Sequence, residues 1–265
     1  MKIGFIGLGN MATAMIGGML EKGLVTCGDI IGSAKTTATI EKIMTRFNIT
    51  TVSENKKVAE QADVLFLAVK PIFLSEVIEE IKDVVRPETL IVSIAAGRTL
   101  AYLREAFGRP ELKLVRCMPN TPALVMEGCT GICAGADVTE EELQRIVGLM
   151  EAFGKASVVP ERLMDVVVGV SGSSPAYVFM FIEAMADEAV AAGMPRKQAY
   201  EFAAQSVLGS AKMVLETGKH PGELKDMVCS PGGTTIEAVK VLEEKGFRAA
   251  VMDAMEACIE KSKNM

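Results

Sequence analysis

Hydrophobic and polar positions alternate in two different ways along the first 160 residues of the chain. Short apolar runs rich in β-branched residues are separated by segments whose apolar positions recur at helical spacing. This alternation is typical of βαβ units around a parallel sheet, and it predicts a doubly wound α/β domain. The predicted strands are Lys2–Ile6, Asp29–Ser33, Asp63–Val69, Thr89–Ile94, Lys113–Met118 and Cys129–Ala134, and the predicted helices are Met11–Lys22, Thr36–Phe47, Ile72–Asp83, Leu100–Phe107 and Glu140–Phe153.

The pattern changes after about Pro160, where the strand signals stop and Ala- and Met-rich helical segments follow. The sequence therefore predicts two domains, a doubly wound one over residues 1–160 and an all-helical one over residues 161–265. Within the second domain, the segment Pro175–Ile182 is apolar on every helical face. Such a helix must be buried on all sides, and a small bundle has little room to enclose it alone. We expect it to be buried against a partner subunit.

Composition and charge exclude several classes of protein. Apolar residues make up 49% of the 265 residues and charged residues 23%, which is incompatible with a disordered or collagen-like chain. Lys and Arg total 28 against 34 for Asp and Glu, so the net charge is -6, and the chain has no basic block. Nucleic acid is therefore not expected as a partner.

The six cysteines form no Cys-x-x-Cys pair and show no regular spacing, which indicates reduced thiols in the cytoplasm. Cys129 and Cys133 are close in sequence, but the single histidine, His220, is far from both. A zinc site would lack its usual ligands, so no metal is expected.

The uncharged stretch Ile3–Leu20 raises the alternative of a signal peptide or a membrane helix. Its glycines argue against both, because Gly4, Gly7 and Gly9 would break an early helix. They indicate a strand followed by a tight turn. We therefore expect a cytoplasmic protein that does not interact with a membrane.

A glycine-rich turn joins the first predicted strand to the first predicted helix. Its first glycine permits a tight turn, its second lets the backbone approach a pyrophosphate, and Ala12 lets helix and strand pack closely, while the helix N-terminus attracts the anion. The turn predicts a Rossmann-type dinucleotide site, and the alternative is a glycine-rich turn without a ligand. The residues expected at the cofactor are Gly7, Leu8, Gly9, Asn10 and Met11.

The end of the second predicted strand indicates which dinucleotide binds. An NAD enzyme presents Asp or Glu there to the ribose 2′-hydroxyl. Asp29 lies at the start of that strand, whereas its end offers hydroxyls and a cation but no carboxylate. The sequence therefore favours NADP, with Ser33, Ala34 and Lys35 at the 2′-phosphate. The alternative is a helix N-cap formed by the same Ser and Thr residues.

Three more strands end in residues suited to a ligand, because ligands of doubly wound sheets gather at the carboxyl ends of the strands. Lys70 is expected to present a cation to the cofactor or to an anionic substrate, and the alternative is a solvated lysine. Small residues at the other ends would let a nicotinamide ring approach the backbone. The residues expected in this crevice are Ala68, Val69, Lys70 and Pro71, then Ala95, Ala96 and Gly97, and finally Asn120 within Met118–Pro122.

Two loops of the helical domain contain hydroxyl groups. Helix capping alone explains the first, Ser171–Ala176. The second, Cys229–Thr235, places two glycines and two threonines at the start of a helix, where free N–H groups and hydroxyls can hold a carboxylate. A capped turn between helices is the alternative. We interpret His220, followed by Pro and Gly, as part of an interhelical turn rather than as a catalyst.

Several of these motifs together resemble the pyrroline-5-carboxylate reductase family, and the resemblance covers the full length of the chain. It implies NAD(P)H-dependent reduction of 1-pyrroline-5-carboxylate to L-proline, with NADPH preferred, by a homodimer or a larger ring of dimers with interlocked helical domains. The motifs that carry it are Gly7–Ala12, Ala68–Pro71, Met118–Pro122, Gly172–Tyr177 and, most specifically, His220–Ala238.

The resemblance also implies roles for individual residues. Asn55 is expected near the adenosine, and the hydroxyl of Thr235 is expected to face the imine, so Thr235 and Lys70 are the expected catalytic residues. In some members a Glu lies shortly before His-Pro-Gly, where this chain has Glu216–Lys219. The residues expected to bind substrate are Asn120, Ser230, Gly232, Gly233, Thr234 and Thr235.

Two alternative functions remain. A β-hydroxyacid dehydrogenase shares the glycine-rich opening, but it needs a lysine soon after its Gly-Ser-Gly loop, and this chain has no lysine between Lys155 and Lys197. A dinucleotide-binding sensor would use the fold without turnover. A protonated cyclic imine needs little acid catalysis, so the reductase function agrees with the absence of a strong acid–base pair in the sequence.

Overall fold

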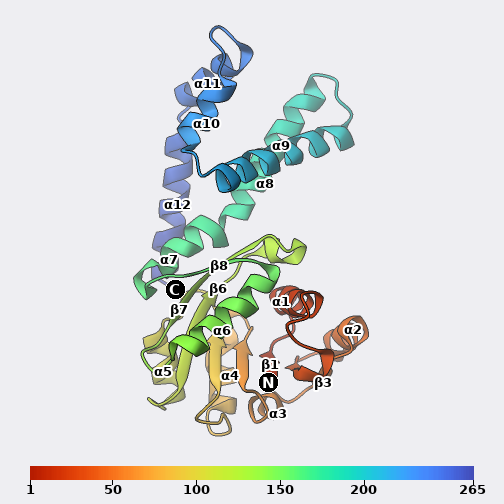
Figure 1. The fold of residues 1–265 in the computed structure, drawn as a ribbon, viewed down its shortest axis with the longest axis vertical. Coiled ribbons are helices and arrows are strands. Elements are labelled where there is room, and N and C mark those ends of the chain that lie inside the picture. The colour runs from red at the N-terminus through yellow and green to blue at the C-terminus, as the bar shows by residue number, and fades with distance from the viewer. The chain divides into compact units, whose positions relative to one another are not determined.

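The computed structural model describes residues 1–265, which form two compact units (Figure 1). The first consists of Met1–Ser173 together with Cys258–Met265, and the second consists of Ser174–Ala257. The first unit is α/β and the second is helical, as the sequence predicts. The helices of the first unit are α1 (Asn10–Glu21), α2 (Thr37–Phe47), α3 (Asn55–Ala59), α4 (Pro71–Ile81), α5 (Leu100–Phe107), α6 (Glu140–Met150) and α7 (Met164–Val167).

An eight-stranded sheet in the order β3-β2-β1-β4-β5-β6-β7-β8 forms the centre of the first unit. The strands from β3 to β6 are parallel, with β1 between β2 and β4, which is the doubly wound arrangement. The α/β fold class is thereby confirmed. The strands are β1 (Ile3–Ile6), β2 (Ile30–Ser33), β3 (Thr50–Val52), β4 (Val64–Leu67), β5 (Leu90–Ser93), β6 (Lys113–Met118), β7 (Gly128–Ala134) and β8 (Gly154–Val158).

The last two strands differ from the sequence prediction of a parallel sheet. Strand β7 is antiparallel to β6, and β8 is parallel to β7. The connection from Met118 to Gly128 holds only a short 3-10 helix, Thr121–Val125, and is too short for a crossover that would return the chain to the same end of the sheet. The strands β3 and β8 were not predicted, because neither has a buried residue and so neither shows a continuous apolar run.

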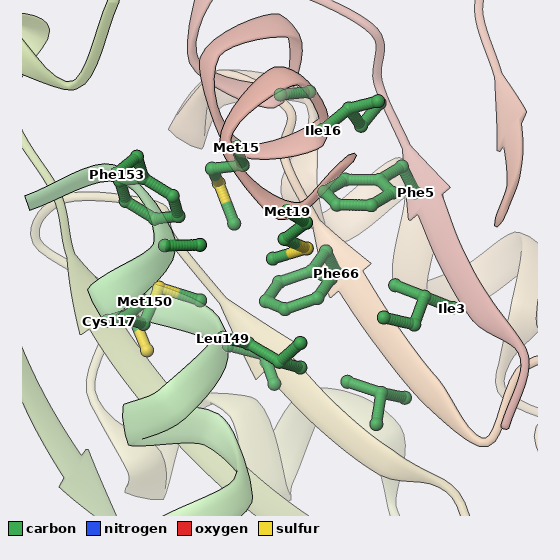
Figure 2. Packing of buried hydrophobic residues seen from close by; sticks show 14 of the residues in the cluster. Ile3, Phe5, Met15, Ile16, Met19, Phe66, Cys117, Leu149, Met150 and Phe153 are labelled. Atoms are coloured by element: carbon green, nitrogen blue, oxygen red, sulfur yellow. The ribbon is translucent and has the colours of Figure 1, made fainter. Parts of the chain in front are cut away.

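Apolar side chains cover both faces of the sheet. On one face they pack against α1, α2 and α6, and on the other against α3, α4 and α5. Figure 2 shows part of the first cluster, where the rings of Phe5 and Phe66 stack with their centroids 4.8 Å apart and Met19 of α1 lies next to them. Fully buried strands read as continuous apolar runs, which is why the sequence reveals β1, β2, β4 and β5.

The apolar N-terminal stretch forms β1 and most of α1 and contributes to this core. One other segment, Glu161–Ala191, is long and apolar enough to cross a membrane by length and composition, with 11% of its apolar window buried. It is not one straight helix. It contains α7, a π-helical turn at Val168–Gly172, and α8 (Ser174–Ala191). The core helix of a soluble protein can pass the same test, and one such segment is weak evidence for a membrane.

The second unit buries very little apolar surface. Its core consists of Ala186, Ala199 and Ala203, and each of its helices exposes large apolar side chains. In α8, Phe179 is 62% exposed and Met180 is 69% exposed, so one chain does not bury this helix on all sides. The remaining helices are α9 (Arg196–Thr217), α10 (Pro221–Val228), α11 (Thr234–Glu244) and α12 (Phe247–Lys263), and the residues of α12 from Cys258 onward belong to the first unit.

Gly128 and Gly154 are paired side by side where the parallel strands β7 and β8 begin. Substitution of Gly154 should destabilise the fold. A Cβ on Gly154, where φ is +153°, would lie 2.0 Å from the carbonyl oxygen of Gly128. We expect Gly154→Ala to lower the free energy of unfolding by roughly 2–4 kcal/mol, because rigid backbone must move. Urea denaturation at fixed protein concentration measures the change.

Gly148→Ala is the matched control, because a Cβ at Gly148 in α6 meets nothing within 4 Å. This exposed helical substitution should be neutral or stabilising by up to ~1 kcal/mol. Equal stability of the two variants would contradict the packing argument.

Candidate active site

The ends of β1, β2 and β4 converge at Gly7. Its N–H donates a hydrogen bond to the Ser33 carbonyl oxygen at 3.0 Å. Its φ is +94°, and a Cβ there would lie 2.6 Å from the Ala68 carbonyl oxygen. Only glycine fits both requirements without strain. The structure thus brings together Gly7, Ser33 and Ala68, three residues that the sequence assigns to one cofactor site.

The turn that follows leaves space and hydrogen-bond donors at the N-terminus of α1. Gly9 is the N-cap residue, no side chain caps the helix, and a Cβ on Gly9 would meet nothing within 4 Å. The first intrahelical bond runs from Thr13 N–H to Gly9, so the N–H groups of Asn10 and Met11 have no backbone partner. The first turn carries no acidic residue. This geometry fits a pyrophosphate group.

Leu8 lies in the same turn, but its side chain does not face the open space. It is buried against Gly32 of β2, where a Cβ would lie 2.6 Å from the Leu8 Cδ2 atom. Only the backbone of Leu8 is positioned to face a ligand.

A hydrogen-bonded chain connects the end of β2 to α3 and α4. The buried hydroxyl of Ser33 donates to Asn55 Oδ1 at 2.7 Å, and Asn55 Nδ2 donates to Glu80 Oε2 at 2.7 Å. Because its hydroxyl is buried and bonded to Asn55, Ser33 fixes the position of the Asn55 side chain. Asn55 begins α3, beside the expected 2′-phosphate region.

Lys35 is the cation of the expected 2′-phosphate region. It directly follows Ala34, and its side chain is exposed. Its Nζ lies 3.4 Å from Glu76 Oε1 and 4.8 Å from the ring centroid of Phe73. Thr36 caps α2 by accepting a hydrogen bond from the Thr39 N–H, so the N-cap alternative holds for this one residue. Glu76 is not predicted from the sequence, because it lies 41 positions after Lys35 and no local pattern shows that α4 reaches the end of β2.

Lys70 is an exposed cation at the carboxyl end of β4. It is the N-cap residue of α4, with Pro71 at the first turn, and its ammonium group forms no hydrogen bond or ion pair. Val69 beside it is half-buried. An unpaired lysine at a strand end is available to an anion, as the sequence interpretation requires.

The next strand end is tightly packed. Ala95 is buried, and its N–H donates to the Ser93 hydroxyl at 3.3 Å. Ala96 is half-buried. Gly97 has φ +71°, and a Cβ there would lie 2.6 Å from the Cβ of Met265. Met265 therefore packs against Gly97.

Asn120 is buried and connects three segments of the first unit. Its Nδ2 donates to the Ser171 carbonyl oxygen at 3.0 Å, and its Oδ1 accepts from the Cys129 N–H at 2.8 Å. Both ends of the amide are thus bound within the protein. In this structure Asn120 positions the loop that leads into α8.

The second unit carries the remaining predicted residues on one loop. Gly232 has φ +66°, and the Gly233 N–H donates to the Ser230 carbonyl oxygen at 3.0 Å. Gly233 is the N-cap residue of α11, whose first turn contains Thr234 and Thr235, both exposed, and lacks a side-chain cap. The loop therefore presents free N–H groups and hydroxyls, which suit a carboxylate.

His220 has a structural role. It is the N-cap residue of α10, and its Nδ1 accepts a hydrogen bond from the Gly222 N–H at 3.0 Å. This agrees with its interpretation as a turn residue.

No group of three or more His, Cys, Asp or Glu side chains is arranged to hold a metal ion. The six cysteines are free. Burial raises the pKa of the Cys133 thiol to about 11 and raises that of Cys117 further. Both thiols are protonated at neutral pH and are poor ligands.

Two family models match the chain. The one described as pyrroline-5-carboxylate reductase dimerisation matches residues 161–265. The one described as NADP oxidoreductase coenzyme F420-dependent matches residues 2–97.

The chain is similar along its whole length to curated reductases. It is 54% identical to the pyrroline-5-carboxylate reductase of Escherichia coli strain K12, with 100% of this chain and 98% of the relative covered. It is 46% identical to that of Methanosarcina acetivorans, with 100% and 97% covered.

Solved structures give the same result. A pyrroline-5-carboxylate reductase from Coxiella burnetii superposes with a TM-score of 0.91 at 33% identity, covering 99% of this chain and 97% of that one. The Plasmodium falciparum pyrroline carboxylate reductase with NADP bound superposes with a TM-score of 0.89 at 32% identity, covering 99% and 97%.

The open space above Gly9 leads to a prediction. We expect Gly9→Val to weaken NADP+ binding at least ~10-fold, because the added side chain fills the pyrophosphate position, while the melting temperature changes little. Titration calorimetry and thermal unfolding measure the two effects. Gly7→Ala is the contrasting variant, because its Cβ would clash with Ala68 and lower stability. If Gly9→Val bound NADP+ as tightly as the wild type, the site would lie elsewhere.

Proposed function

This chain belongs to the pyrroline-5-carboxylate reductase family, and we propose that it reduces 1-pyrroline-5-carboxylate to L-proline with NADPH, the last step of proline synthesis. The observation that carries the proposal is the 54% identity to the Escherichia coli enzyme over the full length of both chains. The chain is an oxidoreductase of the NADP-binding Rossmann type with a helical dimerisation region.

The first unit contains the residues that would hold the cofactor. The N–H groups at the start of α1 would bind the pyrophosphate, and Lys35 would bind the 2′-phosphate, with Asn55 beside the adenosine ribose. Lys70 would present its cation to the cofactor or to the anionic substrate. The backbone of Ala95–Gly97 would flank the nicotinamide ring. NADPH, when bound, supplies the hydride that reduces the imine.

The second unit contains the residues that would hold the substrate. The free N–H groups of Thr234 and Thr235, with the Ser230 hydroxyl, would bind the substrate carboxylate. The Thr235 hydroxyl would orient the imine nitrogen or transfer a proton to it. Because a protonated imine needs little acid catalysis, positioning is the main task of these residues.

Dimerisation follows from the family of residues 161–265 and from the exposed apolar faces of the helical unit. We propose a homodimer or a larger ring of dimers in which α8 is buried between subunits. We also keep the sequence division into residues 1–160 and 161–265 as the functional one, since the dimerisation family begins at residue 161. Free cysteines support a cytoplasmic location, and the net charge of -6 disfavours nucleic acid as a partner.

Only a shared fold supports the alternative function of a β-hydroxyacid dehydrogenase. A 3-hydroxyisobutyrate dehydrogenase from Mycobacterium tuberculosis superposes with a TM-score of 0.51 at 15% identity, which shows a shared fold alone. The chain also has no lysine between Lys155 and Lys197 for that chemistry.

A direct absorbance assay, run with NADPH and with NADH, tests the reaction and the cofactor together. With 1-pyrroline-5-carboxylate, we expect rapid loss of absorbance at 340 nm, faster with NADPH than with NADH, because Lys35 and no carboxylate of β2 meets the ribose. A preference for NADH would keep the reaction and overturn the cofactor assignment. Binding of NADPH without turnover of this substrate would indicate the sensor alternative.

Substitution of Thr235 tests the substrate loop. We expect Thr235→Ala to lower kcat by about 10- to 1,000-fold with little change in NADP+ affinity, because an orienting hydroxyl is lost. Thr235→Ser keeps the hydroxyl and should retain most of the activity. Steady-state kinetics of both variants measure these effects. Full turnover by Thr235→Ala would refute the proposed role of the Thr235 hydroxyl.

A further inference from the structure

The exposed face of α4 places two carboxylates beside the proposed adenosine site. Glu76 and Glu80 are four residues apart on this helix and therefore share a face. Glu76 contacts Lys35, and Glu80 accepts a hydrogen bond from Asn55. The end of β2 lacks a carboxylate, but Glu76 and Glu80 of α4 supply negative charge beside Lys35 and Asn55.

Lys35 is already partnered in the free protein. Its Nζ lies 3.4 Å from Glu76 Oε1, and the ring of Phe73 lies beneath it with its centroid at 4.8 Å. Phe73 and Glu76 belong to one helix turn, so both contacts hold the ammonium group near α4. A 2′-phosphate must compete with Glu76 for this cation, whereas a 2′-hydroxyl needs no cation.

We propose that Glu76 is a specificity-determining residue that lowers the preference for NADPH over NADH by competing with the 2′-phosphate for Lys35. This inference rests on the proposed cofactor site. It concerns the ratio of the two affinities, which the assignment of NADP alone does not determine.

The size of the effect follows from charge and exposure. Lys35 and Glu76 are each 66% exposed, so their ion pair is weak and can open when a ligand arrives. A bound 2′-phosphate carries up to about two negative charges close to the Glu76 carboxylate, which adds repulsion screened by water and salt. Loss of the Glu76 charge should therefore tighten NADP+ binding about 3- to 10-fold and change NAD+ binding less than about 2-fold.

Calorimetric titration of the full-length protein with NADP+ and with NAD+ tests this without catalysis. The variant is Glu76→Gln, and the matched control is Glu79→Gln, which removes the same charge from the same helix at a residue that pairs with Lys82. We expect Glu76→Gln to raise the ratio of the NAD+ to the NADP+ dissociation constant about 3- to 10-fold, and Glu79→Gln to leave it within about 2-fold of the wild type.

A double-mutant cycle isolates the contribution of Lys35. In a Lys35→Met background, the gain from Glu76→Gln should shrink, because no cation remains to be released. An unchanged ratio in Glu76→Gln, or an equal gain in Glu79→Gln, would overturn the inference. Failure of the proposed reaction is a separate result: a wild-type chain that binds both dinucleotides but reduces no pyrroline-5-carboxylate would refute the reaction and leave this comparison valid.

Discussion

The helical unit has too small a core to stand alone, and this constraint shapes the rest of the protein. Its buried residues are three alanines, while every helix from α8 to α12 exposes large apolar side chains. Burial of apolar surface is the main favourable term in folding, and alanine contributes the least of the apolar residues. The missing surface must come from another subunit. The proposed substrate loop at the start of α11 is therefore built on an element whose stability depends on assembly.

The first unit is organised around a different constraint, the close approach of backbone at Gly7. Strand β1 lies between β2 and β4, so the turn after β1 meets the ends of both neighbours. The hydrogen bond to Ser33 and the contact with Ala68 leave no room for a side chain. Gly9, two residues later, faces open space instead. Gly7 is thus needed for packing, and Gly9 leaves the space that the proposed cofactor would enter, in line with the different roles that the sequence predicts for the two glycines.

The sequence predicts the features that depend on burial or on local geometry, and it does not predict contacts between distant segments. Strands buried on both faces appear as continuous apolar runs, so β1, β2, β4 and β5 were predictable, whereas β3 and β8, which have no buried residue, were not. The glycine turn was predictable because its requirements are local. The links from Ser33 to Asn55 to Glu80, and from Lys35 to Glu76, join residues 22 to 41 positions apart. No local pattern encodes such pairs, because they depend on which helix lies beside which strand end. The internal bonding of Asn120 was hidden for the same reason.

The composition of the candidate site matches the chemistry of an imine that needs to be positioned more than activated. Its predicted groups are backbone N–H donors, hydroxyls and lysines, and the one histidine is an N-cap residue. A reaction that required strong general acid–base catalysis would need a titratable pair within hydrogen-bond reach. Hydride transfer to a protonated imine needs instead a fixed distance between two carbons and an anchored carboxylate. Rigid turns at the ends of strands and helices provide this, because their backbone donors do not have to reorganise during the reaction. In the proposed function, the glycines at both turns serve catalysis because they would let the ligands approach the backbone directly.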